Sequence, residues 1–568
     1  YISEISKKNY VSPETETEKL VCGIVEKLFN LQENEVGKKT NLFEIGLNSM
    51  TAIKLISHIK NHYNIKIGIK DVNNHPIIDD LSLYIDSQKS DKSNVEEVNA
   101  IKHDDNYEFS MSLNQNPKFS LKYLKFALRN IHTTMYYKLN CDIDINKLTD
   151  AANQMLDRHL ILKSVVSEVE IDGVKTKIGR VKSDIKLQIE EYNRNNFEKF
   201  IRSYDITNEN LIRIGLIEKS ILIIDMNHYI TDGFTMSLFV HELFKIYNNE
   251  PLQQPVQYGD YTKYYNNKLK ETNLSTEINY YKKLFSETSD ITCLPYKTKF
   301  KNDIKSIQNS KPYQIFKICK MLVLRKDRDI RRVEFELNNS TYNLINKTAK
   351  QYNVSKTAYF MAIHSLVLSF YSKQKNIYSL FIDSNRKSLK METIIGYLAR
   401  GMPFSLSVNN NITLLDLIIK CYNILLKLYD FVSPPYKVLD ELKINSSAVV
   451  FKYDPYDMFS SNENNVYDNI AINDVYKYFN KTYPKANKID IGRNVEYLFN
   501  VGEMKDKYNV YLTYDFDLFD EKLIKGIVNM FTDVIGNESL LHTNIGDIFE
   551  KYSNSNNNEE KINLQIEI

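Results

Sequence analysis

The first ninety residues of the chain carry apolar side chains at the spacing of amphipathic helices. Three stretches show this pattern: Glu14 to Asn30, Thr51 to Tyr63, and a segment from Asn74 to Ile85 that has Pro76 near its start. Apolar positions three and four residues apart fall on one side of a helix, and proline is tolerated at the beginning of a helix. We therefore expect a small all-α helical bundle in this part of the chain.

From about residue 106 onward the pattern alternates between strands and helices. Leu211 to Met226 contains two apolar, β-branched runs separated by three polar residues, which predicts a β-hairpin. Apolar residues at helical spacing follow from Phe234 to Tyr247. The second half repeats the order of strand, long helix, strand and loop, so we expect an α/β (α+β) fold. Further predicted strands are 331–337, 377–382, 448–453 and 508–514, and further predicted helices are 148–156, 268–286, 340–352, 355–371 and 521–535, the last of which would close the globular part.

Polar stretches divide the chain into units. Asp86 to Asp105 is nearly free of large apolar groups, as is typical of a linker. The Asn-, Ser- and Glu-rich stretch from Ser553 to Glu560 is typical of a disordered tail or linker, and Asp290 to Asp329 has no clean periodicity. We expect the bundle in residues 1–87, a linker in 88–105, an N-terminal lobe in 106–275, a C-terminal lobe in 276–550 and a tail in 551–568.

Composition excludes several classes of function. The chain has 74 basic and 72 acidic residues, and its net charge of +2 creates no field that would attract nucleic acid or an anionic membrane. The longest apolar-rich run, Ala358 to Tyr371, is too short to span a bilayer, so we expect a buried helix with His364 in the core. The five cysteines are scattered and match neither a disulfide framework nor a zinc pattern, which favours a reducing, cytoplasmic setting. Because the sequence begins with Tyr1 and lacks a leader, we expect it to be part of a longer polypeptide.

The junction between the predicted hairpin and the next helix has the polar sequence Asn227-His228-Tyr229-Ile230-Thr231-Asp232-Gly233. Junctions of this kind present reactive groups on a rigid scaffold. In a structural interpretation, His228 is a loop histidine, Asp232 caps the helix and Gly233 belongs to the turn. In a catalytic interpretation, His228 accepts a proton from a nucleophile while another group fixes its tautomer, and Gly233 leaves space for a substrate.

These residues resemble the His-His-x-x-x-Asp-Gly motif of condensation domains in nonribosomal peptide synthetases, which are relatives of chloramphenicol acetyltransferase. His228, Asp232 and Gly233 match the motif, and Asn227 stands in place of its first histidine. The resemblance implies two chloramphenicol acetyltransferase-like lobes with a tunnel past His228, which would be the catalytic residue. It also implies that Arg386 pairs with Asp232, and a buried aspartate needs such a partner.

Other stretches resemble further motifs of the same family. Arg158 to Ser164 is similar to its Arg-His-x-x-Leu-Arg-x motif, which implies that Arg158 and His159 brace the fold near the active site. On local evidence alone, these two residues fit a solvated helix C-terminus equally well. Gln257 to Tyr265 contains the Tyr-x-Asp-Tyr motif. Ile395 to Pro403 is similar to Ile-Gly-x-Phe-Val-Asn-Thr-x-Pro, with Arg400 in the asparagine position, where it would alter the lining of the tunnel.

Ser49 lies at the start of a predicted helix, shortly after Gly46. A serine in this context is usually an ordinary helix cap. Together with His75-Pro76-Ile77, however, Leu42 to Ser49 resembles a carrier protein, whose serine hydroxyl bears a phosphopantetheine arm. A helix N-terminus stabilises the negative charge of a phosphodiester. The resemblance therefore implies phosphopantetheine bound covalently to Ser49 by a phosphopantetheinyl transferase.

The resemblance as a whole implies a carrier protein followed by a condensation domain, an acyltransferase of nonribosomal peptide synthesis. It would form an amide bond between an acyl or peptidyl thioester on a carrier and the amine of an acceptor on another carrier of the same assembly line. No metal is expected, because no third ligand accompanies His228 and Asp232.

Three alternatives stay open. A catalytically silent recruitment module is suggested by the replaced first histidine. An epimerisation domain uses a Glu-Gly-His-Gly-Arg segment where this chain has Asp383-Ser384-Asn385-Arg386-Lys387. An ester-forming variant would accept a hydroxyl group in place of the amine.

Overall fold

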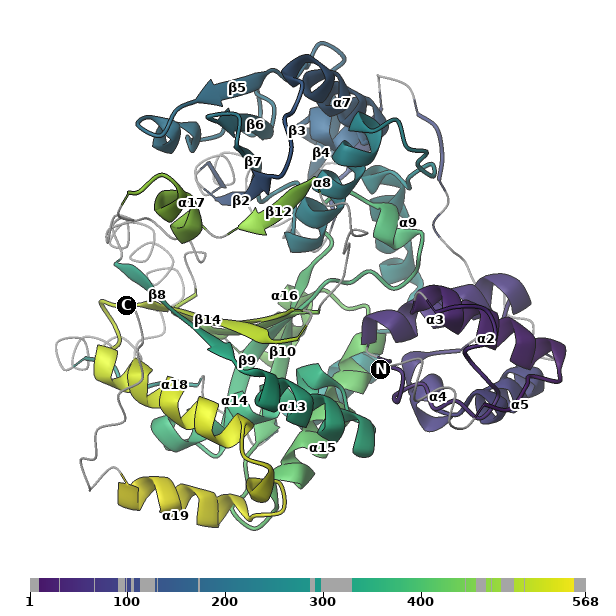
Figure 1. Ribbon diagram of the computed structural model, residues 1–568, viewed down its shortest axis with the longest axis vertical. Helices are drawn as coiled ribbons and strands as arrows, with labels where there is room; N and C mark the ends of the chain where they lie inside the picture. Colours follow the sequence, from purple (N-terminus) through teal and green to yellow (C-terminus); the bar gives the residue numbers. More distant parts are fainter. Residues whose placement is uncertain are drawn as a thin grey trace.

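A computed structural model of the chain (Figure 1) describes residues 10–29, 31–47, 49–65, 67–89, 98, 100–103, 107–112, 128–129, 131–171, 174–286, 292–297, 329–444, 446–455, 466–470, 472–481, 495–504 and 506–555. Most of the segment without clean periodicity, and the end of the predicted tail from residue 556, lie outside these ranges. Within the described ranges, no helix has the length and apolar character needed to cross a membrane.

Residues 10–89 form the predicted helical bundle, which has a hydrophobic core of its own. The helix α2 (Glu16–Leu28) begins with a capping box, in which Thr15 and Glu18 each accept a hydrogen bond from the other's backbone N–H. The helices α3 (Ser49–Tyr63) and α5 (Ile78–Gln88) correspond to the other two predicted helices. The sequence pattern missed α4 (Ile69–Asn74), because six residues are too few to show a helical period.

The first lobe of the α/β part is built on a sheet with the strand order β12-β2-β7-β6-β5. The predicted hairpin is present as β6 (Ile212–Ile217) and β7 (Ile221–Asn227), which pair antiparallel and are buried along their whole length. The other elements of this half are β1 (Glu108–Ser110), β2 (His132–Leu139), α7 (Ile145–Arg158), η2 (Leu160–Lys163), β3 (Ser164–Ile171), β4 (Val174–Val181), β5 (Ile189–Tyr192), η3 (Phe197–Phe200), α8 (Gly233–Tyr247), α9 (Tyr258–Glu271) and α10 (Ser275–Leu284).

The second lobe is built on a sheet with the strand order β10-β9-β11-β13-β14-β8. Its central helix α14 (Lys356–Ser372) begins at the predicted cap Ser355, whose side chain accepts a hydrogen bond from the N–H of Ala358. The other elements are β8 (Ile330–Leu337), α13 (Asn339–Gln351), β9 (Asn376–Asp383), η4 (Met391–Thr393), β10 (Arg400–Ser407), α15 (Leu414–Asp430), α16 (Pro435–Leu442), β11 (Val449–Asp454), β12 (Tyr467–Ile470), α17 (Ile472–Tyr478), β13 (Tyr497–Glu503), β14 (Tyr508–Asp515), α18 (Glu521–Ile535), η5 (Glu538–Leu540) and α19 (Ile545–Ser555).

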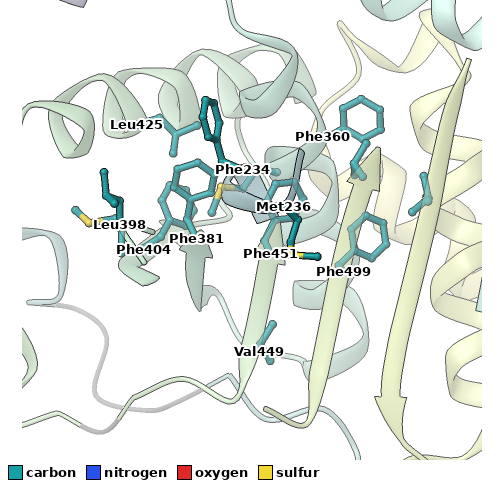
Figure 2. Packing of buried hydrophobic residues seen from close by; sticks show 14 of the residues in the cluster. Phe234, Met236, Phe360, Phe381, Leu398, Phe404, Leu425, Val449, Phe451 and Phe499 are labelled. Carbon is teal, nitrogen blue, oxygen red and sulfur yellow. The ribbon is translucent and has the colours of Figure 1, made fainter. Parts of the chain in front are cut away.

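The two lobes interlock in both directions. Strand β12, which comes from the second half of the sequence, pairs with β2 and completes the sheet of the first lobe. Conversely, Phe234 and Met236 of α8 belong to the same hydrophobic cluster as Phe381, Leu398 and Phe451 of the second lobe, as Figure 2 shows. The junction between β7 and α8 is therefore held from both sides.

One helix prediction was wrong in extent, and another, over 521–535, has the predicted bounds but not the predicted place at the end of the globular part. The helix expected over 268–286 is interrupted at Thr272, and a new helix, α10, starts where the side chain of Asn273 accepts a hydrogen bond from the N–H of Ser275. The helix α18 does not close the globular part, because α19 follows it and buries Ile545 and Ile548. The first five residues of the predicted tail 551–568 belong to α19.

His364 lies in the core, as predicted, and this position predicts a pH dependence of stability. Its side chain packs among Phe451, Tyr497 and Phe499, and burial lowers its pKa from 6.5 to about 3. The unfolded state therefore binds a proton more readily, and the stability contributed by the neutral ring is complete above pH 6.5 and is lost as the pH falls toward 3. We expect the thermal midpoint of His364→Phe to fall less steeply than that of the parent over this range, which calorimetry at several pH values would measure; parallel curves would contradict it.

Candidate active site at the lobe junction

The β6–β7 hairpin brings His228 to the boundary between the two lobes. Asp232 is the N-cap of α8, and its side chain accepts a hydrogen bond from the N–H of Thr235. The N–H of His228 donates to the carbonyl of Ile131, 3.0 Å away, at the start of β2. The turn from His228 to Asp232 is therefore fixed at both ends: by the cap at Asp232, which the sequence pattern predicts, and by the bond to Ile131, which it does not.

The ring of His228 is oriented by a backbone carbonyl. Its Nδ1 lies 2.7 Å from the carbonyl oxygen of Thr231. Because a carbonyl only accepts hydrogen bonds, Nδ1 carries the proton, and Nε2 of the neutral ring keeps its lone pair. The side chain is partly exposed, and the Tyr397 ring stands edge-on to it with 5.4 Å between the ring centroids. Among the described residues, Nε2 has no hydrogen-bond partner.

Asp232 and Arg386 form the expected ion pair, which joins the lobes. Nη1 of Arg386 donates to Oδ2 of Asp232 at 2.9 Å, and the same oxygen accepts from the N–H groups of Leu398 and Ala399 at 3.0 Å. Burial opposes the charge on Asp232, but the charge of Arg386 and these hydrogen bonds keep the pKa of the carboxyl group below its usual value. Asp232 therefore holds the two lobes together at the site, whereas the tautomer of His228 is set by the Thr231 carbonyl.

A second set of contacts closes the brace around Gly396. The N–H of Gly396 donates to the hydroxyl of Thr235, which itself donates to the Gly396 carbonyl. Arg386 Nη2 also donates to this hydroxyl, at 3.1 Å. Gly396 has a φ of +156°, and a Cβ there would lie 2.2 Å from the ring of Tyr258, so only glycine fits. The close approach of the Tyr258 ring therefore explains why the motif similar to Ile395 to Pro403 has a glycine at this position.

Gly233 lies where the second lobe approaches the start of α8. A Cβ at Gly233 would be 3.3 Å from Nζ of Lys452, which belongs to β11. Lys452 forms an ion pair with Asp454 at 2.9 Å. A larger residue at 233 would therefore require the lysine to move. Sequence reasoning missed Lys452, because a single lysine in a strand carries no motif.

Asn227, which replaces the first histidine of the motif, is fully buried and connects neighbouring segments. Its side-chain amide donates to the carbonyl of Leu128 at 2.7 Å and accepts from the N–H of Tyr229 at 3.0 Å. Both polar atoms of the side chain are therefore satisfied. The replacement leaves the backbone of the turn tied down.

Arg158 and His159 contact α8 through Glu242. Nε of Arg158 and Nε2 of His159 lie 2.8 and 2.6 Å from the same carboxylate oxygen of Glu242. Burial opposes the charge of Glu242, but these bonds lower its pKa to about 2. His159 is buried, so the structure favours a bracing position over a solvated helix end.

Arg400 forms a buried ion pair within the second lobe. It lies directly opposite Asp383 in the pairing of β9 and β10, and its Nε and Nη2 donate to Oδ2 of Asp383 at 3.1 and 3.0 Å. Its side chain has no exposed area. The arginine in the asparagine position is therefore neutralised by a partner that the sequence motif did not reveal.

Ser49 is the first residue of α3, and Gly46 before it has a φ of +100°, which a glycine adopts without strain. The side chain of Ser49 lies outside the described atoms. The first turn of α3 contains no acidic residue, so its backbone N–H groups and the helix dipole favour a phosphodiester without opposition from a carboxylate. These residues fit a phosphopantetheine arm.

Comparison with known proteins identifies both parts of the chain. Residues 108–544 match the family described as Condensation domain, and residues 19–85 match the family described as Phosphopantetheine attachment site. The chain therefore belongs to the condensation-domain family, and it carries a phosphopantetheine carrier domain in front of that domain, as in nonribosomal peptide synthetases. The predicted bundle, the α/β fold and the cofactor are confirmed.

The relatives are much longer than this chain. A plipastatin synthase protein of Bacillus subtilis (strain 168) is 21% identical over 545 residues, which are 94% of this chain and 14% of that protein. Surfactin synthase subunit 2 of the same organism is 26% identical over 305 residues, or 52% of this chain and 8% of that protein. The chain thus spans a small part of the curated relatives that it matches.

Solved structures share the fold at low sequence identity. The condensation domain of the Monacolin K polyketide synthase MokA has a TM-score of 0.60 at 13% identity, covering 77% of this chain and 99% of that chain. The epimerization domain of the third module of tyrocidine synthetase B has a TM-score of 0.57 at 14% identity, covering 79% and 99%. The X-domain from teicoplanin biosynthesis has a TM-score of 0.59 at 14% identity, covering 80% and 99%.

Proposed function

We propose that this chain forms an amide bond between an acyl or peptidyl group on its own carrier and the amine of an acceptor held by another carrier. The observation that carries the proposal is the orientation of His228, a partly exposed residue at the lobe junction: its Nδ1 is bound to the Thr231 carbonyl, and its Nε2 is left to accept a proton. An amine that attacks a carbonyl must lose a proton, and an oriented imidazole is suited to accept it.

Ser49 is the proposed attachment residue for the phosphopantetheine arm. When bound, this group supplies a thiol that holds the donor as a thioester. The chain's own residues then have two tasks: Nε2 of His228 accepts a proton from the acceptor amine, and the Asp232–Arg386 pair keeps the turn that bears His228 in place. No metal takes part in this proposal. The partners would be other carrier domains of an assembly line and a phosphopantetheinyl transferase; nucleic acid and membranes have no part in it.

Contacts between the bundle and the second lobe support a donor role for the carrier. The carrier helices, in purple in Figure 1, stand beside α15, whose Leu426 and Tyr429 pack on the carrier core. The N–H of Leu389 donates to the hydroxyl of Ser57, 3.2 Å away. The helix α3 that begins at Ser49 thus lies against the segment that leads from Arg386 to Gly396.

The epimerisation alternative has less support. An epimerase needs an acid partner for its histidine, and the corresponding segment here supplies Asp383 and Arg386. Asp383 is bound to Arg400, and Arg386 is bound to Asp232. Both charged groups are therefore used in buried ion pairs. Asn227, the residue that motivates the silent-module alternative, uses both polar atoms of its side chain to tie the His228 turn to its neighbours.

A product assay with the full chain tests the proposal. Phosphopantetheinyl transferase and a panel of acyl- and aminoacyl-coenzyme A compounds would load the carrier, and aminoacyl and hydroxyacyl thioesters of N-acetylcysteamine would serve as acceptors. We expect amide products by mass spectrometry and none from Ser49→Ala, which cannot be loaded. An ester from the hydroxyl acceptors alone would indicate the ester-forming variant. Deuterium uptake from D₂O at the α-carbon without condensation would indicate epimerisation, and a loaded carrier with no product would leave the silent module.

Lys54 of the carrier and Glu392 of the second lobe form an ion pair. We therefore expect the rate at which the carrier brings its donor to the condensation domain to depend on the charges of these two residues. Nζ of Lys54 lies 3.7 Å from Oε2 of Glu392, whose other oxygen is buried without a hydrogen-bond partner. Burial raises the pKa of Glu392 against the opposing charge of Lys54. Because the buried carboxylate of Glu392 has few partners, the contact stabilises the docked carrier only weakly, and the carrier can leave the second lobe between catalytic cycles.

We expect Lys54→Glu to slow single-turnover product formation from the donor on its own carrier by roughly tenfold, because like charges then face each other. The double variant Lys54→Glu with Glu392→Lys should recover most of the rate. Lys19→Glu is the matched control, since Lys19 is exposed on α2 and pairs only with Glu16 among the described residues. Equal rates for the parent and Lys54→Glu would show that the Lys54–Glu392 contact has no part in bringing the donor to the condensation domain.

A further inference from the structure

A second histidine–aspartate pair lies beside the candidate site. Nδ1 of His132, the first residue of β2, is 2.9 Å from Oδ2 of Asp225 in β7. Asp225 is fully buried, and it also accepts hydrogen bonds from the hydroxyls of Thr134 at 2.8 Å and Tyr204 at 2.9 Å. A carboxylate held by three donors is fixed in place, so it also fixes the orientation of the His132 ring.

The pairing of the strands places His132 next to the site of the motif's missing histidine. In the antiparallel pairing of β2 and β7, His132 is directly opposite Asn227. Residues that face each other in this way have side chains on the same side of the sheet, roughly 5 Å apart at Cβ. The chain therefore has an imidazole on the neighbouring strand, beside the position where the family motif has its first histidine.

His132 also belongs to the segment on which the His228 turn rests. The carbonyl of Ile131 accepts from the N–H of His228, and the carbonyl of Leu128 accepts from the side chain of Asn227. The His132–Asp225 contact is the third link between the 128–132 segment and the end of β7. It is the only one of these three links that joins two ionisable side chains.

A charged residue, Arg213, lies close to the His132–Asp225 pair and has partners of its own. The guanidinium of Arg213 lies 3.8 Å from the centre of the Tyr204 ring and is itself bound to Glu209 and to the carbonyls of residues 202 and 203. Nε2 of His132 has no hydrogen-bond partner among the described residues, and 14% of the side chain is exposed. Asp225 is thus the group that determines how the ring is held.

We propose that His132, oriented by Asp225, is a positioning residue for His228, and that together with Asn227 it replaces the first histidine of the motif. This inference rests on the proposed function of His228. In physical terms, the pair anchors the start of β2, and Ile131, the neighbour of His132, then holds the backbone of His228. Since a displacement of about 1 Å can cost about a hundredfold in rate, loss of this anchor should lower the rate of the chemical step.

Two variants separate the bond to Asp225 from the rest of the ring. Asparagine carries an amide nitrogen near the position of Nδ1 and has nothing at the position of Nε2, so His132→Asn retains the donor to Asp225 and His132→Ala does not. We expect His132→Ala to lower kcat of amide formation roughly tenfold to a hundredfold, with KM for the acceptor thioester within about twofold of the parent's, and His132→Asn to stay within about threefold of the parent.

The matched control is His103→Ala, because His103 forms a histidine–aspartate contact of the same length with Asp260 and, in the part of the chain that the structure describes, contacts none of the residues that hold His228. Parent-like kcat in His132→Ala would overturn the proposal. So would equal loss in both folded His132 variants, because the ring would then act through Nε2. If His132→Ala does not fold, a parent-like His132→Asn supports the proposal and an impaired one overturns it. An inactive His228→Ala beside fully active His132 variants would refute this inference alone. An active His228→Ala would refute the role of His228 on which the inference rests, and absence of amide product from the parent would refute the proposed function.

Discussion

Replacing His228 with alanine is expected to reduce the rate of amide formation by roughly 10²- to 10⁴-fold, the usual contribution of a positioned acid–base group. The variant removes Nε2, which has no hydrogen-bond partner among the described residues and lies at the lobe junction, and it leaves the Asp232–Arg386 ion pair intact. The fold should survive, because the side chain is partly exposed and its one hydrogen bond within the described ranges goes to the carbonyl of the nearby Thr231.

The measurement is the rate of product formation in a single turnover, starting from protein whose carrier holds the donor thioester. The intact mass of each variant shows that its carrier is loaded, so a loading defect is not mistaken for a slower reaction. His228→Asn is an informative companion, because its amide nitrogen can reproduce the donor to the Thr231 carbonyl without supplying Nε2. Loss in both variants supports proton acceptance by Nε2. Full activity of His228→Asn would mean that orientation of the turn is sufficient, and full activity of His228→Ala would contradict a role for this histidine.

Removing either partner of the Asp232–Arg386 pair is expected to give the largest loss of stability. The side chains of both residues are almost completely buried, so Asp232→Ala leaves the guanidinium without a counter-charge and the N–H groups of Leu398 and Ala399 without their acceptor. Breaking a buried pair in this way costs about 3–5 kcal/mol. We expect a clearly lower thermal midpoint for the condensation domain and no product.

Arg386→Lys separates charge from geometry in the same pair. Lysine keeps the positive charge but cannot reach the Thr235 hydroxyl and the Gly396 carbonyl at the same time as Asp232, as the guanidinium does. Its midpoint should therefore lie between those of the parent and Asp232→Ala. The exposed pair Lys347–Glu538 provides the control, since exposed ion pairs contribute little and Lys347→Ala should leave the midpoint close to that of the parent. A midpoint of Asp232→Ala equal to that of the control would show that the brace is not needed.

Local pattern was enough to predict the central features of the fold. The β6–β7 hairpin, the helix α8 and the cap at Asp232 each follow from a few neighbouring residues, whose period and turn chemistry are visible in the sequence. The pairing of Asp232 with Arg386 came from the family resemblance and from the cost of burying an unpaired carboxylate. These features needed no knowledge of the chain's path in three dimensions.

The contacts that local pattern missed depend on strand register and on segments far apart in the sequence. His132 meets Asp225 because β2 pairs with β7, and Arg400 meets Asp383 because β10 pairs with β9. No local signal marks such partners, because a shift of the register by one residue would separate them. Lys452 approaches Gly233 only because the two lobes pack together.

The contribution of β12 to the sheet of the first lobe has a consequence for how this protein folds during synthesis and how it can be recombined. While only the first half of the chain has been synthesised, the β2 edge of its sheet has no partner strand. Exposed sheet edges of this kind promote aggregation. The first half can reach its final form only after the residues of β12 have emerged. A chimaera with its crossover near residue 275 would require β12 of one parent to complete the first-lobe sheet of the other, whereas a crossover in the segment before β1 would transfer the whole condensation unit intact.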